Sequence, residues 1–207
     1  MVGYKKYKKI IDYYKKSFIK NGFTYKALNW KSIKKNNLRF TTAFKFIKKK
    51  SSILDFGCGT SLFYKFLKKK KIKIKYYGID TSPEVIKYCN KKFISNTYYC
   101  VDIFDSKNNF DNKFDYVFAN GLFTLKINLS DSEMKNFLKS ALIKLFSITK
   151  KSLIFNLLSR HVDWKNRQNY YPKISEIISI IKKNLSGHFV IDHNYDKFEY
   201  MVKVDKK

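Results

Sequence analysis

The sequence has few cysteines and prolines, very little arginine and no long apolar run. The three cysteines, Cys58, Cys89 and Cys100, are odd in number and lack the spacing of metal ligands. They argue against a disulfide framework and a metal site, so we expect free thiols in a cytoplasmic protein. No stretch reaches the roughly 18 apolar residues of a membrane helix. Lysines interrupt the apolar residues at the start of the chain, which argues against a signal peptide.

Acidic residues are also scarce, with 16 Asp and Glu against 44 Lys and Arg and a net charge of +28. Such a charge is typical of nucleic-acid-binding proteins. However, every basic residue except Arg39, Arg160 and Arg167 is a lysine, whereas phosphate-binding surfaces often use the bidentate guanidinium group. The abundance of Lys, Ile, Asn, Phe and Tyr is the bias that an AT-rich genome produces. We therefore interpret the lysines as a solvated surface, and nucleic acid is the less favoured partner.

The length of 207 residues suits one domain with a sizeable core. Residues 1–49 contain two amphipathic helical segments, 4–20 and 31–49, and we expect them to form an N-terminal lid. Residues 50–207 alternate between strand and helix patterns and form the main domain. Strands are expected at 52–56, 74–79, 97–101, 114–119, 151–156, 188–193 and 198–204.

The helices between these strands carry recognisable start signals. Ser82 precedes Pro83 as an N-cap residue, and Ser130 and Glu133 have the spacing of a capping box. Strands that alternate with helices pair in parallel through right-handed crossovers. The turn residues 194–196 join the last two strands as a hairpin. The sequence therefore predicts an α/β fold, a seven-stranded mostly parallel sheet with helices on both faces and a C-terminal antiparallel hairpin.

The most informative stretch is residues 53–61, ILDFGCGTS, where an apolar strand runs into Gly57 and Gly59 and then into a helix. Glycine allows the tight turn and the close approach of a ligand to the backbone. The next strand ends in Asp80, 21 residues after Gly59, where a carboxylate can accept hydrogen bonds from ribose hydroxyls. The third strand ends in a second acid, Asp102. Together these features predict a nucleotide-type cofactor site.

With these motifs the chain resembles the class I S-adenosylmethionine-dependent methyltransferases over residues 50–207. Their nucleotide motif reads like LDFGCGT, and they have a Rossmann-like seven-stranded sheet. The resemblance implies S-adenosylmethionine as cofactor, and it implies the following contacts: Asp55, Gly57 and Gly59 at the methionine portion, Asp80 at the ribose, Asp102 and Ile103 at the adenine, and Cys58, Thr81 and Asn120 beside them. Ser61 departs from the family, which often has a third glycine there; serine should be tolerated if that position already lies in the helix.

A nicotinamide dehydrogenase is the rival interpretation of the glycine turn. It would need a further glycine at Leu62 for close packing of helix and strand. It would also need more chain for a substrate domain. Asp80 and Asp102 could also be solvated strand ends without a role. That interpretation does not explain why the Gly57 and Gly59 turn precedes them at the spacing of a strand–helix–strand unit. Methyl transfer is therefore the favoured function.

The loops that follow the fourth and fifth strands should flank the methyl group, because ligands bind beyond the carboxyl ends of parallel strands. Asn120 is followed by Gly-Leu-Phe and lacks the proline-containing tetrapeptide of nucleic-acid amino methyltransferases. The segments 27–30 and 39–40 resemble those of small methyltransferases of polysaccharide and specialised-metabolite pathways. We therefore expect transfer to an oxygen or nitrogen of a small-molecule acceptor, a sugar or metabolite. An RNA methyltransferase and a non-catalytic binding module remain alternatives.

The candidate catalytic residues are His161, Asp163 and Asn120. His161 lies on the loop after the fifth strand and could deprotonate a hydroxyl acceptor, or it could be a loop histidine without a chemical role. Trp30 could close over the cofactor as part of the lid, or it could serve packing alone. No His and carboxylate cluster has ligand spacing, so no metal is expected. No feature of the sequence indicates an oligomeric state.

Overall fold

The protein is described by a computed structural model that covers residues 4–28, 32–105, 108 and 110–206. The helices are α1 (Tyr4–Asn21), the 3₁₀-helix η1 (Tyr25–Leu28), α2 (Ile33–Lys45), α3 (Leu62–Lys69), α4 (Pro83–Lys92), α5 (Asp131–Ser147) and α6 (Ile174–Asn184). The strands are β1 (Ser52–Phe56), β2 (Lys75–Asp80), β3 (Thr97–Cys100), β4 (Phe114–Ala119), β5 (Thr149–Leu158), β6 (Phe189–Asp192) and β7 (Glu199–Asp205).

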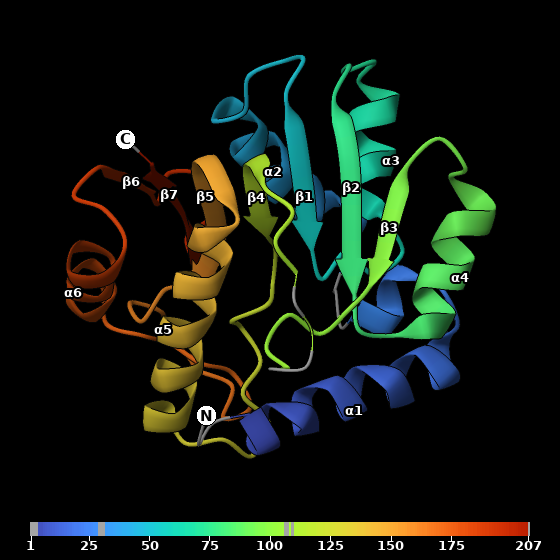
Figure 1. The fold of residues 1–207 in the computed structure, drawn as a ribbon. Coiled ribbons are helices and arrows are strands. Elements are labelled where there is room, and N and C mark those ends of the chain that lie inside the picture. Colours follow the sequence, from blue (N-terminus) through green and yellow to red (C-terminus); the bar gives the residue numbers. More distant parts are fainter. Residues whose placement is uncertain (1–3, 29–31, 106–107, 109, 207) are drawn as a thin grey trace.

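The described strands form one sheet in the order β3-β2-β1-β4-β5-β7-β6 (Figure 1). Adjacent strands among β1–β5 pair in parallel, whereas β7 runs antiparallel to both β5 and β6. This confirms the predicted seven-stranded sheet with its antiparallel C-terminal hairpin. The chain adds β2 and β3 on one side of β1 and then returns to add β4 on the other side, so the strand order reverses between β1 and β4. Ligand sites in such sheets lie at this reversal, beyond the carboxyl ends of the strands.

Helices cover both faces of the sheet because successive strand residues point to opposite sides. On one face Leu54 and Val117 belong to a buried cluster that includes residues of α5 and α6. On the other face Ile53 and Phe118 belong to a cluster with residues of α2, α3 and α4. The central strands β1 and β4 therefore bury both of their faces, which accounts for their near-continuous apolar runs in the sequence.

The predicted helix starts are confirmed. The Ser82 hydroxyl accepts a hydrogen bond from the Val85 N–H, and the capping box of Ser130 and Glu133 is complete. The second helix is shorter than the expected 31–49, since α2 ends at Lys45. Its last turn tightens there, with Phe46 and Ile47 donating to carbonyls three residues back, at Ala43 and Phe44.

Helix α1 lies across the carboxyl ends of the parallel strands, at the bottom of Figure 1. Near its start, Tyr7 stacks on Phe137 of α5 with ring centroids 4.5 Å apart. Just beyond its end, Phe23 stacks on Tyr88 of α4, also at 4.5 Å. The N-terminal segment thus spans the sheet edge from α5 to α4 and covers the place where a ligand is expected.

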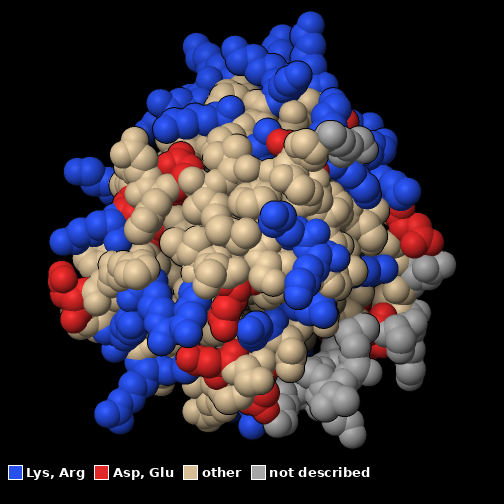
Figure 2. Space-filling model, turned by 90° about the vertical axis from the view of Figure 1, so that its left-hand side faces the viewer, with Lys and Arg blue, Asp and Glu red and all other residues tan. Residues whose placement is uncertain are grey.

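The visible surface is rich in basic side chains. Figure 2 shows Lys and Arg in several groups around a central area of other residues, with acidic side chains between some of them. On this face the positive charge is therefore distributed rather than gathered into one groove. Across the part of the chain that the structure describes, no helix is both long enough and apolar enough to cross a bilayer.

Candidate active site

The turn after β1 has the backbone geometry that requires glycine. Gly57 and Gly59 have φ values of +72° and +49°, in the left-handed region that favours glycine. The N–H groups of Gly57 and Cys58 both donate to the carbonyl of Ile79 on β2, at 2.9 and 3.0 Å. A Cβ on Gly57 would meet no atom within 4 Å. The turn is therefore fixed to the neighbouring strand while Gly57 leaves room for a ligand.

Ser61 does not lie inside the helix, so the condition under which serine should be tolerated there is not met. It precedes α3 as the N-cap residue and has a φ of +54°, also in the left-handed region. This backbone conformation explains why a third glycine is common at this position. The buried Ser61 hydroxyl donates to the Tyr98 hydroxyl at 3.0 Å and contacts the Cys89 thiol at 3.3 Å. These hydrogen bonds stabilise serine in a conformation that its Cβ disfavours.

Two carboxylates lie beside this turn. Asp80 accepts hydrogen bonds from the N–H groups of Gly59 and Ser82, at 3.1 and 3.0 Å. Burial raises the pKa of Asp80, and these backbone donors act in the opposite direction. Asp55 on β1 is 4% exposed and accepts a hydrogen bond from the Tyr76 hydroxyl at 2.6 Å. Burial raises the pKa of Asp55 to about 7, although the Tyr76 hydrogen bond lowers it.

The loop after β4 is held by a buried polar network. The Gly121 N–H, at a φ of +75°, donates to the Asn156 Oδ1 at 2.7 Å. The fully buried Asn156 donates in turn to Glu199 at 3.2 Å. Arg39 of α2 binds the same Glu199 carboxylate with two nitrogens, and its Nε lies 2.6 Å from Oε1. The network thus joins α2, the loop after β4, β5 and β7.

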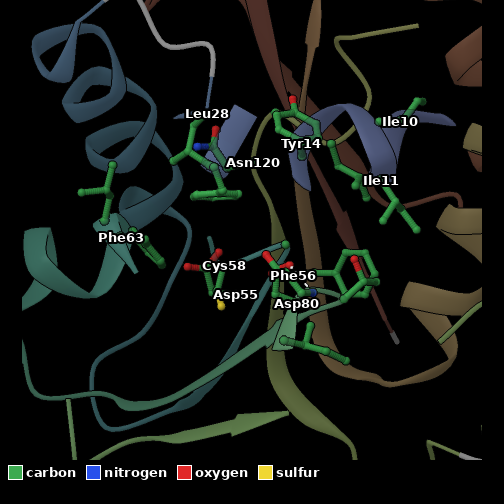
Figure 3. A pocket seen from close by; sticks show the side chains of 18 of the residues that line it. Ile10, Ile11, Tyr14, Leu28, Asp55, Phe56, Cys58, Phe63, Asp80 and Asn120 are labelled. Atoms are coloured by element: carbon green, nitrogen blue, oxygen red, sulfur yellow. Dashed lines mark hydrogen bonds between the residues drawn. The ribbon is translucent and has the colours of Figure 1, made fainter. Parts of the chain in front are cut away.

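A first cavity of about 120 Å³ lies over the carboxyl ends of β1, β2 and β4. Figure 3 shows Tyr14 of α1 on one side of it and the carboxylates of Asp55 and Asp80 on another. It is lined by Tyr7, Ile10, Ile11, Tyr14, Lys15, Phe18, Leu28, Phe40, Asp55, Phe56, Gly57, Cys58, Leu62, Phe63, Ile79, Asp80, Thr81, Ser82, Val101, Asn120, Gly121 and Leu122. The buried Oδ1 of Asn120 has no hydrogen-bond partner among the described residues.

A second cavity of about 520 Å³ adjoins the first. Its walls mix amide, hydroxyl, charged and aromatic side chains, and Arg39 and Glu199 are among them. It is lined by Tyr14, Leu28, Ser32, Lys35, Asn36, Arg39, Gly121, Thr124, Leu125, Leu158, Val162, Trp164, Asn166, Gln168, Asn169, Tyr171, Asp196, Phe198 and Glu199. Tyr14, Leu28 and Gly121 line both cavities.

The structure brings most of the sequence-derived cofactor residues together. The first cavity contains Asp55, Gly57, Cys58, Asp80, Thr81 and Asn120. Gly59 lies beside them but under Leu28, whose Cδ2 would be 3.0 Å from a Cβ on that glycine.

The expected adenine and lid residues are placed differently. Neither Asp102 nor Ile103 lines the first cavity, and their neighbour Val101 does. Ile103 is buried in the core, and Asp102 accepts a hydrogen bond from the Phe104 N–H at 3.0 Å. Their assignment to the adenine therefore stays a prediction. Trp30 lies outside the described residues.

The loop after β5 places its two candidate catalytic residues outside both cavities. His161 and Asp163 are exposed, whereas Val162 and Trp164 line the second cavity. The chain bends at residues 160, 162 and 163, so neighbouring side chains of this loop face different directions. The catalytic roles of His161 and Asp163 stay predictions, and either role would require the loop to turn.

Sequence reasoning gave no site role to Tyr14, Asn156 or Glu199. Glu199 opens an apolar strand, EYMVKV, and a carboxylate at such a position is a signal for a buried partner. Tyr14 was assigned only to an amphipathic helix, and Asn156 only to the start of a loop. Nothing in the sequence shows which side chain of such a segment faces a cavity.

Comparisons with known proteins agree with this geometry. A family model described as methyltransferase domain matches residues 47–204. A methyltransferase candidate of Mycobacterium tuberculosis, Rv1506c, is 25% identical over 160 residues, which are 75% of this chain and 93% of that protein.

Two solved structures share the fold at low sequence identity. The magnesium protoporphyrin IX methyltransferase ChlM of Synechocystis PCC 6803, with bound SAH, has a TM-score of 0.61 and 13% identity, and the match covers 95% of this chain and 94% of that one. The plantazolicin methyltransferase BpumL, in complex with a monoazolic desmethylPZN analog and SAH, has a TM-score of 0.54 and 15% identity, covering 84% and 81%.

Proposed function

This chain belongs to the methyltransferase domain family and uses S-adenosylmethionine, and we propose that it methylates an oxygen or nitrogen of a small molecule, a sugar or metabolite. The observation that supports this acceptor class is the pair of adjoining cavities at the carboxyl edge of the sheet. The first is lined by most of the residues that we propose for the cofactor. The second adjoins it at Tyr14, Leu28 and Gly121, where a methyl group can pass from one ligand to the other.

The residues of the first cavity fit S-adenosylmethionine. Gly57 is open to a ligand, and the unpartnered Oδ1 of Asn120 can accept a hydrogen bond from an ammonium group. Asp80 would hold the ribose, and Asp55 would add negative charge near a cationic ligand. When bound, the cofactor supplies an electrophilic methyl group: its carbon–sulfur bond breaks as a bond to the acceptor forms, sulfur keeps the electron pair, and any proton lost from the acceptor goes to a base or to water.

Within the segment predicted as a lid, residues 1–49, helix α1 would act as the lid over the cofactor, whereas α2 packs in the core. The first cavity, at about 120 Å³, is smaller than the roughly 300–1,000 Å³ of typical ligand sites. Ile10, Ile11, Tyr14 and Phe18 of α1 line this cavity. Because these side chains face the strand ends, α1 would move outward to admit the cofactor and close again to exclude water.

The second cavity supports a small, polar acceptor. Its volume of about 520 Å³ lies within the usual range for small-molecule sites. Its amides, hydroxyls and charged groups offer both donors and acceptors, while Trp164 and Phe198 offer apolar faces. Two solved structures with the same fold are named as methyltransferases of magnesium protoporphyrin IX and of plantazolicin. His161 is our proposed base for a hydroxyl acceptor, provided that the loop after β5 turns.

Two experiments test this function. Calorimetry with S-adenosylhomocysteine should show binding to the wild-type protein, and Asp80→Ala should weaken it by more than about tenfold, because a charged hydrogen-bond acceptor is lost. Asp111→Ala, on an exposed loop, is the matched control.

The second experiment incubates the enzyme and radiolabelled S-adenosylmethionine with metabolite pools and with RNA pools. We expect label in small molecules. Label only in RNA, persisting at physiological salt, would overturn the acceptor class. Failure of the wild-type protein to bind the cofactor would support a non-catalytic module.

A further inference from the structure

Three described residues line both cavities: Tyr14 of α1, Leu28 of η1 and Gly121 of the loop after β4. They therefore mark the junction between the cofactor and the acceptor. Gly121 is fixed there by its hydrogen bond to Asn156, and Leu28 packs over Gly59. Only Tyr14 brings a ring and a polar atom to this junction.

Tyr14 is held in place by the surrounding core. It packs against the large buried cluster on the α5 and α6 face, and its ring makes an edge contact with Tyr13 at 5.7 Å. Tyr14 lines both cavities, and Arg39 and Asp80 each line one of them. Burial raises the pKa of Tyr14 to about 12, so the hydroxyl keeps its proton at neutral pH.

The chemistry of the donor suits such a side chain. S-adenosylmethionine carries a permanent positive charge on sulfur, and that charge polarises its methyl group. An aromatic face attracts a cation, and a neutral hydroxyl oxygen can accept a weak hydrogen bond from a polarised C–H group. S-adenosylhomocysteine has neither the charge nor the methyl group. A residue at the methyl position should therefore distinguish the two ligands.

On this basis, and resting on the proposed function, we propose that Tyr14 contacts the sulfonium centre and the departing methyl group and directs that methyl toward the second cavity. Tyr14 would then favour the charged donor over the neutral product. It would not act as a base, because its proton stays in place. Leu28 and Gly121 would limit the width of the passage on its other sides.

Calorimetry with the two ligands tests this role without an identified acceptor. In Tyr14→Phe, which loses only the hydroxyl, we expect S-adenosylmethionine to bind about threefold more weakly. In Tyr14→Leu, which also loses the ring, the loss should reach about tenfold. In both variants S-adenosylhomocysteine should change by less than twofold. Tyr13→Phe, on the neighbouring residue that lines neither cavity, is the matched control and should change neither ligand.

A second measurement uses the wild-type protein, so that it does not depend on whether the leucine variant folds. With isotope-labelled tyrosine and methyl-labelled S-adenosylmethionine, a nuclear Overhauser contact should join the methyl protons to one tyrosine ring and should vanish in Tyr14→Phe. An unchanged ratio of the two affinities, together with no such contact, would refute the role of Tyr14. If the wild-type protein binds neither ligand, the proposed function itself fails.

Discussion

Replacing Asp55 with asparagine should make the ligand-free protein more stable at alkaline pH. Asp55 is 4% exposed, and burial raises its pKa from 3.8 to about 7. A carboxyl group whose pKa is higher in the folded than in the unfolded state binds more protons when folded. The stability that this group contributes is therefore lost as the pH rises from its pKa in the unfolded state to its pKa in the folded state. Asparagine has a similar shape and no titratable proton, so the variant should not show this loss.

The size of the effect follows from the two pKa values. Each unit of pKa difference corresponds to about 1.4 kcal/mol, so the shift from 3.8 to about 7 costs the wild-type protein about 4 kcal/mol of stability once the pH is above 7. Between pH 5 and pH 8 the linkage relation gives about 2–3 kcal/mol of that total. The Tyr76 hydroxyl, 2.6 Å from Asp55 Oδ2, can donate equally to the amide oxygen of asparagine, so the hydrogen bond is retained.

Urea denaturation at pH 5, 6, 7 and 8 measures this effect. The stability difference between Asp55→Asn and wild type should grow by about 2–3 kcal/mol across that range, with unchanged m-values. Asp111→Asn removes an exposed carboxylate and reports the effect of net charge alone. If the stability of Asp55→Asn and of wild type changes with pH in the same way, Asp55 is ionised in the folded protein even at pH 5. That result would refute the reasoning from burial.

Three further predictions concern other parts of the site. Arg39→Ala leaves the Glu199 carboxylate, 6% exposed, without its cation, and urea denaturation should show the fold destabilised by about 3–5 kcal/mol. Adding Glu199→Gln to the same chain should restore much of the lost stability, and no restoration would show that Arg39 acts through packing. Hydrogen exchange in α1 should slow when cofactor and acceptor bind, whereas equal exchange with and without ligands would exclude a lid. His161→Ala should lower kcat about 100-fold with cofactor affinity kept, and full activity would exclude the base.

The sequence by itself determined the order of elements and the core of the cofactor site. The glycine turn, Asp80 and the capping residues each act within one strand–turn–helix unit, and their spacing reveals the unit. Parallel pairing then brings the strand ends to one edge, so Asp55, Gly57, Asp80 and Asn120 meet there without further information. Ser61 shows the limit of such reasoning, because a shift of one residue at the helix start changed its backbone conformation.

Only the tertiary structure decided which distant side chains meet and which neighbours face away. Arg39 and Glu199 are 160 positions apart, and nothing local to either residue specifies their contact. Likewise, helical spacing places Tyr14 on an apolar face, but the packing of α1 across the sheet brings it to the junction of the cavities. In the loop after β5, Val162 faces the second cavity and His161 faces solvent. The physical reason is that residue type fixes the chemistry of a side chain, while its direction is set by how whole elements pack.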